Sequence, residues 1–125
     1  MTHTERTLRL LRDRGFRSQI VERWIFKVGA PGGGYRLDLF NIIDIVALTP
    51  AGVLGVQSCG DSFSEHRAKI VEEHAEETRL WLSTPGCSLI LIGWRKIKRK
   101  LKDGSWSAQG TYQPREELIT LDMIK

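Results

Sequence analysis

The order of apolar and polar positions along the chain predicts that it begins with a helix. Thr2 and Glu5 have the spacing of a capping box, in which each side chain accepts a backbone N–H group of the first helical turn. Leu8 and Leu11 follow on one helical face, and Gly15 is a natural left-handed stop. The pattern therefore predicts an N-terminal helix that ends near residue 14.

Four further segments have the composition of β-strands, because β-branched and aromatic residues are frequent in them. The expected strands are Ser18–Val28, Ile42–Leu48, Val53–Ser58 and Cys87–Trp94. The second and third are almost continuously apolar, which indicates central strands covered on both faces. The segment 30–34 has three glycines but lacks the lysine of a phosphate-binding loop, so we interpret it as a hairpin or a mobile loop.

A second helix is expected from about residue 62 to residue 82. Ser62 and Glu65 repeat the capping-box spacing, and small or apolar residues recur along one stripe as far as Leu82. Pro85-Gly86 then ends the helix. Because this helix separates the third and fourth strands, the order of elements is αβββαβ.

The C-terminal third is expected to add β-structure to this core. Trp94–Lys102 and Ser105–Tyr112 flank a turn at Asp103-Gly104 and predict a hairpin, and Glu117–Met123 is predicted to be an edge strand. The whole chain of 125 residues is therefore interpreted as one α/β domain with a mixed central sheet and a C-terminal β-hairpin extension.

Composition narrows the class of protein. Hydrophobic residues make up 41% of the chain and charged residues 27%, which is typical of a globular protein. No run approaches the roughly 20 apolar residues that cross a bilayer, and the polar segment 1–14 does not have the pattern of a signal peptide. Cys59 and Cys87 are too few for a disulfide scaffold and form no CxxC pair, so we expect two reduced thiols in a cytoplasmic protein.

The positive charge of the chain is unevenly distributed. The net charge is +4, and six of the nine residues from 94 to 102 are Arg or Lys. Alternate residues of a strand share a face, so lysines would line one side of the predicted hairpin beside a tryptophan. The predicted nucleic-acid contacts are Trp94, Arg95, Lys96, Lys98, Arg99, Lys100 and Lys102. Such a row suits a phosphate backbone and a stacked base, although lysines on an edge strand also prevent aggregation.

Asp44 is the strongest candidate for chemistry, because it lies inside an apolar run between Ile43 and Ile45. A buried carboxylate is costly unless it is paired, hydrogen-bonded or bound to a metal. The next strand ends in Gln57-Ser58-Cys59, and a hairpin with a short turn can bring Asp44 and Gln57 side by side at the same end of the sheet. Two oxygen ligands on adjacent strands can hold Mg²⁺ or Mn²⁺.

These segments resemble the PD-(D/E)XK nuclease superfamily, and within it the archaeal-type Holliday junction resolvases and small phage-encoded resolvase-like proteins. The resemblance extends over most of the chain and rests on short motifs. They are Asp44 to Leu48 followed by Gly55 to Cys59, the Arg-x-Asp-x-Phe segment 36–40, and Gly-Trp-Arg-Lys at 93–96. It implies a restriction-endonuclease-like αβββαβ core.

The resemblance also implies roles for individual residues. Asp44 matches the metal-binding aspartate, and Glu5 matches the acidic residue of the first helix, although the capping box alone accounts for Glu5. Gln57 stands where the motif has Asp or Glu, and Cys59 stands where it has lysine. A cysteine cannot replace a lysine that orients water and stabilises negative charge, so a lysine of the next helix, Lys69, is the candidate substitute.

Asp38 and the three histidines are the remaining candidates near this site. Asp38 is either a second metal-site carboxylate or a loop residue paired with Arg36. The three histidines are expected to be solvated, and His66 is the one nearest to the candidate site.

The expected function is therefore a Mg²⁺- or Mn²⁺-dependent endonuclease that acts on branched DNA as a homodimer. Because Gln57 and Cys59 depart from the motif, the alternative is a nucleic-acid-binding protein that keeps the fold and has lost the chemistry. A protein-interaction domain is a third reading.

Overall fold

The computed structural model describes residues 1–125, apart from the side chains of Arg99, Ala108 and Gln109. It is an α/β structure built on a mixed five-stranded sheet with the strand order β1-β4-β5-β6-β7. The strands are β1 (Arg17–Ile20), β4 (Ile45–Thr49), β5 (Gly52–Cys59), β6 (Cys87–Lys100) and β7 (Trp106–Ile119). Neighbours are antiparallel except β5 and β6, which are parallel.

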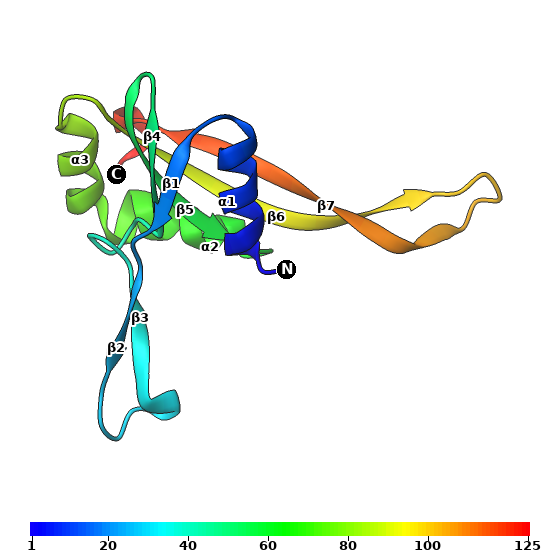
Figure 1. The fold of residues 1–125 in the computed structure, drawn as a ribbon, viewed down its shortest axis with the longest axis horizontal. Helices are drawn as coiled ribbons and strands as arrows, with labels where there is room; N and C mark the ends of the chain where they lie inside the picture. Colours follow the sequence, from blue (N-terminus) through cyan, green and yellow to red (C-terminus); the bar gives the residue numbers. More distant parts are fainter.

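Helices cover both faces of this sheet (Figure 1). Helix α1 (His3–Asp13) begins with the predicted capping box, in which Thr2 Oγ1 accepts the Glu5 N–H and Glu5 accepts the Thr2 N–H. It packs Leu11 against Ile45, Ile92 and the other buried residues of one face. The opposite face is covered by α2 (Phe63–Ala68), a π-helical turn (Lys69–Glu73) and α3 (Ala75–Ser83).

Two β-ribbons extend from this body (Figure 1). We call the outer part of the β6–β7 pair, from residue 95 to residue 113, the arm. The second ribbon consists of β2 (Arg23–Phe26) and β3 (Gly34–Leu37), which pair only with each other and are joined through a short 3₁₀ turn, Pro31–Gly33. We call it the side ribbon. Among the described residues, no helix has the length and apolar character needed to span a membrane.

The predicted α/β class and the mixed central sheet are confirmed, and the chain adds the strands β2 and β3 between β1 and β4. The single strand predicted over Ser18–Val28 is wrong, because the chain leaves the central sheet at Val21 and Glu22. Both of their N–H groups donate to the Asp44 carbonyl, at 2.8 and 3.2 Å, and the residues after them belong to the side ribbon. The imperfect alternation of this segment reflects two short strands in different sheets.

Two other boundaries differ from the prediction. The second helix is not continuous, because the π-helical turn and His74 separate α2 from α3. The Ser62–Glu65 capping box does not form, since Ser62 makes no side-chain cap and its Oγ lies 3.1 Å from His66 Nδ1. At the C-terminus, residues 117–119 are the end of β7 and Leu121–Met123 is a 3₁₀ turn, so there is no separate edge strand there.

Candidate functional site

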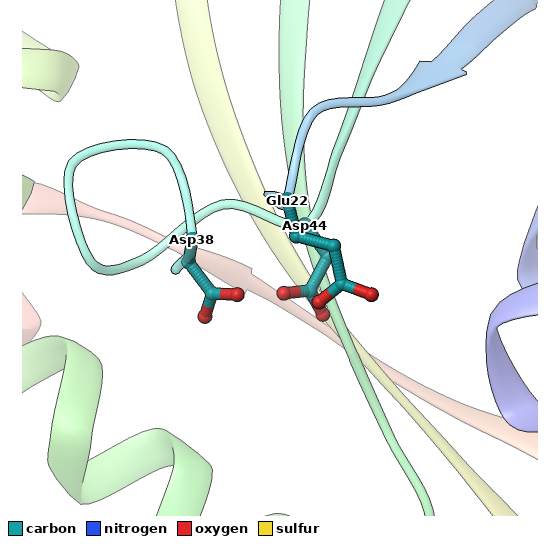
Figure 2. Close-up of side chains that lie close together, drawn as sticks. All are labelled: Glu22, Asp38 and Asp44. Carbon is teal, nitrogen blue, oxygen red and sulfur yellow. The ribbon is translucent and has the colours of Figure 1, made fainter. Parts of the chain in front are cut away.

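Three carboxylates from separate segments converge beside the central sheet (Figure 2). Glu22 lies between β1 and β2, Asp38 follows β3, and Asp44 precedes β4. One oxygen atom of each lies within 4.8 Å of the others, so the three side chains could together hold a metal ion. The two bounding residues of the side ribbon, Glu22 and Asp38, are thus brought to the start of β4.

Backbone contacts around Asp44 explain this convergence. Its carbonyl accepts the Val21 and Glu22 N–H groups, and its own N–H donates to the Val56 carbonyl at 2.9 Å. Asp38 is drawn in by a tight turn, in which Phe40 and Asn41 have positive φ angles of 53° and 64°. Such angles are uncommon for residues other than glycine, so this turn is conformationally strained.

Asp44 is only 4% exposed, and its Oδ2 atom accepts two hydrogen bonds. The Gln57 amide nitrogen donates at 2.8 Å and the Ser58 backbone N–H at 2.9 Å. Burial, together with hydrogen bonding to the neighbouring Asp38 carboxylate and repulsion from it, raises the pKa of Asp44 to about 8. In the absence of a cation, Asp44 therefore retains a proton near neutral pH and shares it with Asp38.

The pKa of Asp38 is shifted in the opposite direction from that of Asp44. Burial alone would raise its pKa, but hydrogen bonds from Asp44 and Lys69 hold that pKa below its usual value. Lys69 Nζ lies 3.0 Å from Asp38 Oδ2, and Lys69 is the first residue of the π-helical turn. π-Turns occur frequently at functional sites, because the extra residue changes the direction of nearby side chains.

Gln57 adds to the acidic cluster a buried polar atom that has no partner among the described residues. It is 2% exposed, and within the described part of the chain its Oε1 atom has no hydrogen-bond partner. An unpartnered buried oxygen is costly. Reversing the amide would place Oε1 against the Asp44 carboxylate and leave the nitrogen without a partner, so it would not remove the problem. The Gln57 side chain lines the same cleft as the carboxylates, so its unpartnered oxygen is a candidate ligand.

The cleft has a volume of about 290 Å³. It is lined by His3, Glu22, Arg36, Asp38, Asp44, Gln57, Ser58, His66 and Lys69. Arg36 donates to Glu22 Oε1 at 2.9 Å, and partial burial lowers the pKa of His3. The cleft therefore combines acidic side chains with cations that can face a bound anion.

Four predicted site residues, Asp38, Asp44, Gln57 and Lys69, are brought together here. The alternative pairing of Asp38 with Arg36 does not occur, because Arg36 pairs with Glu22 and Asp38 with Lys69. Glu5 does not line this cleft. It caps α1 and borders the adjoining hollow.

Sequence reasoning missed Glu22 and His3. The signal for Glu22 was present, because it is the acidic residue at the point where the predicted first strand loses its alternation. Cys59, at the lysine position of the motif, is buried, and burial raises the pKa of its thiol to about 11, so it is neither charged nor nucleophilic at neutral pH.

The predicted basic surface lies along the arm, with one correction. Trp94 is 8% exposed and its indole N–H donates to Thr7 Oγ1 at 2.8 Å, so the prediction that it stacks on a base is wrong. Its ring is part of the core under α1. The exposed cations of the arm are Arg95, Lys96, Lys98, Lys100 and Lys102, whereas the Arg99 side chain lies outside the described residues.

The lysines also do not form one uninterrupted row. The pairing of β6 with β7 shifts between Lys98 and Lys100, and β6 ends at Lys100. An irregularity of this kind changes which face the following residues occupy. Lys96 and Lys98 remain on one face, and Lys96 is paired with Tyr112 of β7. The Arg6 guanidinium lies over the Tyr112 ring, 3.5 Å from its centroid.

Comparison with protein-family models, with curated proteins and with solved structures finds no match to this chain.

Proposed function

We propose that this chain is a metal-dependent DNA endonuclease with a restriction-endonuclease-like fold, and that it acts on branched DNA in the manner of a Holliday junction resolvase. The observation that carries the proposal is the meeting of three carboxylates with the unpartnered Oε1 of Gln57. Carboxylate and amide oxygens are the ligands that Mg²⁺ and Mn²⁺ prefer, and such ions keep open positions for water and phosphate oxygens.

In this proposal Asp44 and Gln57 hold the cation, and Asp38 or Glu22 completes the protein ligands. A bound divalent cation would neutralise charge on the phosphate and lower the pKa of a bound water. Binding would also displace the proton of Asp44, whose pKa of about 8 reflects burial beside Asp38. Metal affinity should therefore increase with pH up to about 8.

Lys69 takes the role of the lysine that the motif lacks at Cys59. Its ammonium group already faces the site through Asp38, at 3.0 Å. From there it would orient the attacking water or stabilise the negative charge that develops on the phosphate. The arm would hold the duplex through phosphate contacts, and the two equivalent cut sites of a four-way junction favour a two-fold dimer.

The test is cleavage of a four-way junction and of a linear duplex with Mg²⁺ or Mn²⁺. We expect wild type to cleave and Asp44→Asn to lose activity about 100-fold or more, since metal stabilisation of a transition state is worth several kcal/mol. Asp13→Asn, which changes an exposed acid at the end of α1, is the matched control and should keep full activity. Equal activity of wild type and Asp44→Asn would contradict the proposal that Asp44 holds the catalytic cation.

A nucleic-acid-binding protein without catalysis is the second candidate. It is favoured by the neutral side chain of Gln57 and by the buried, uncharged Cys59. It predicts salt-dependent DNA binding, no cleavage with either cation and no increase in thermal stability on addition of Mn²⁺. A Mn²⁺-dependent thermal shift that Asp44→Asn abolishes would contradict it.

A further inference from the structure

The side ribbon carries an apolar stripe that the metal site does not explain. Trp24 is 43% exposed, Phe26 is 86% exposed and Val28 is fully exposed. The rings of Trp24 and Phe26 meet edge to face, with centroids 6.5 Å apart. Large apolar side chains gathered at a projecting tip commonly mark an interaction surface.

The stripe lies on the same side of the ribbon as the carboxylate cleft. Alternate residues of a strand share a face, so Trp24 and Phe26 are on one side, together with Arg36, which is opposite Trp24 in the β2–β3 register. Arg36 pairs with Glu22 and lines the cleft. Glu22 itself lies two residues before Trp24, so the stripe continues outward from a carboxylate of the site.

Charge indicates the partner. Residues 23–37 contain three cations and no acidic residue. Arg36 shares the face of Trp24, whereas Arg23 projects from the opposite face and Lys27 follows the end of β2. A cation beside aromatic rings is typical of surfaces that bind single-stranded nucleic acid, because the cation meets a phosphate and every base offers a face for stacking. Within a duplex the base faces are already stacked, so the surface fits unpaired bases.

We propose that the side ribbon is a stacking platform for unpaired bases beside the phosphate that is cut. This inference rests on the proposed function for the position of that phosphate. At a rise of about 3.3 Å per residue, Trp24 lies about 7 Å and Phe26 about 13 Å along the ribbon from Glu22. Bases stack at 3.4 Å intervals, so the platform reaches roughly two to four nucleotides from the site.

The side ribbon is a short unit that is paired separately from the central sheet. Its strands pair over only four residues, and two-stranded ribbons of this kind are marginally stable alone. Its loop contains Gly29, Gly32 and Gly33 with φ angles of 84°, 72° and 80°. Residues other than glycine rarely adopt such angles. The tip is thus built from local turns and can be changed without disturbing the core.

The experiment measures binding in EDTA, where no cleavage occurs. Two DNAs of equal length are compared: a duplex with an unpaired 3′ or 5′ flap that carries 2-aminopurine at the second or fourth flap nucleotide, and the fully paired duplex. Wild type should bind the flap more tightly and quench 2-aminopurine. Phe26→Ala should weaken flap binding about 5- to 150-fold, the range for loss of one stacked base, and should leave duplex binding unchanged.

Two variants serve as controls. Phe26→Trp keeps an aromatic ring and should keep the preference for the flap. Leu80→Ala removes another exposed apolar side chain, 64% exposed on α3, and should behave as wild type. Phe26 is exposed, so its replacement should not alter the thermal unfolding temperature, which is measured in parallel.

Equal binding of flap and duplex by wild type would overturn the inference, as would an unchanged preference in Phe26→Ala. Phe26-dependent binding to vesicles of anionic phospholipid, without flap preference, would overturn it in favour of a membrane surface. Cleavage without flap preference would contradict the stacking platform and leave the proposed nuclease function standing. Flap preference without cleavage in Mg²⁺ or Mn²⁺ would contradict the nuclease function and leave the stacking surface standing.

Discussion

Two β-ribbons project from this protein, and they are attached to its body in different ways (Figure 1). The arm is the outer part of two 14-residue strands of the central sheet, and the part of β6 that leads into it is buried at Leu91, Ile92 and Trp94. The side ribbon has strands of four residues that pair only with each other. Its two ends are instead fixed where Glu22 and Asp38 meet at Asp44.

The two ribbons are therefore held in place by different interactions. The inner parts of β6 and β7 are held by apolar burial that they share with the whole domain, so the arm extends from a fixed base. The side ribbon obtains little from burial, and its position depends on backbone hydrogen bonds and charges at the candidate site. Changes in pH or bound metal should therefore affect the base of the side ribbon and leave the root of the arm unchanged.

The largest expected effect comes from the root of the arm. Ile92 is fully buried, so Ile92→Ala should lower the free energy of unfolding by about 2–5 kcal/mol through lost burial and a residual cavity. Ile25→Ala, the equivalent change in the side ribbon, should cost less because Ile25 is only partly buried. Urea unfolding of both variants gives the comparison, and a larger loss for Ile25→Ala would mean that the side ribbon is part of the cooperative core.

The base of the side ribbon should make stability depend on pH. The pKa of Asp44 is about 8 in the folded chain, against a usual value of 3.8. The folded state therefore binds the proton more tightly, and the Asp44 contribution to stability is complete below pH 4 and lost as pH rises to about 8. In EDTA, the free energy of unfolding of wild type relative to Asp44→Asn should fall over this window.

Asp13→Asn is the reference for this measurement and should keep the pH dependence of wild type. Addition of Mn²⁺ at pH 8 should restore the stability of wild type and Asp13→Asn but not that of Asp44→Asn. If wild type and Asp44→Asn have parallel profiles without metal, Asp44 does not hold the proton that its burial implies.

The lysines of the arm should act through charge alone. Lys96→Ala combined with Lys98→Ala should weaken DNA binding about 10-fold or more at 0.1 M salt and reduce the slope of log K against log salt by about 2. Arg79→Ala combined with Lys125→Ala removes the same charge elsewhere and should leave the slope unchanged. An unchanged slope in the arm variant would show that the arm does not contact phosphates.

Much of the fold could be predicted from the sequence because its elements have strong local signals. The apolar runs of β4, β5 and β6 and the capping box of α1 are such signals. The break at Val21 and Glu22 was missed because it depends on a long-range contact, two N–H groups that reach the Asp44 carbonyl. The division of the second helix was missed because a π-turn has no clear pattern in sequence.

The candidate site was only partly predictable for the same reason. Asp44 and Gln57 are conspicuous as polar residues at the ends of apolar strands, and these neighbours form a hydrogen bond of 2.8 Å. Glu22 reaches them through the return of the side ribbon, which no local spacing encodes. Trp94 was misassigned because a tryptophan beside lysines is compatible with a stacking surface or with the edge of a core, and only the packing of α1 decides between them.

The smallest expected effect tests whether the arm and the site communicate. A buried chain of hydrogen bonds joins them: Trp94 Nε1 donates to Thr7 Oγ1 at 2.8 Å, Thr7 Oγ1 lies 2.7 Å from Ser58 Oγ, and the Ser58 N–H reaches Asp44. Trp94→Phe removes the first bond and keeps an aromatic ring. It should lower stability by about 1 kcal/mol, the usual value of one such bond.

Mn²⁺ affinity should change less than about 2-fold in Trp94→Phe, because the bond that touches the carboxylate comes from the Ser58 backbone, which the substitution leaves in place. Calorimetric titration with Mn²⁺ measures this, with Trp106→Phe at the exposed outer end of the arm as the matched control. A tenfold loss of Mn²⁺ affinity in Trp94→Phe alone would mean that the root of the arm positions Asp44. In that case the two ribbons would act as one coupled unit, and their different attachment would not make them independent.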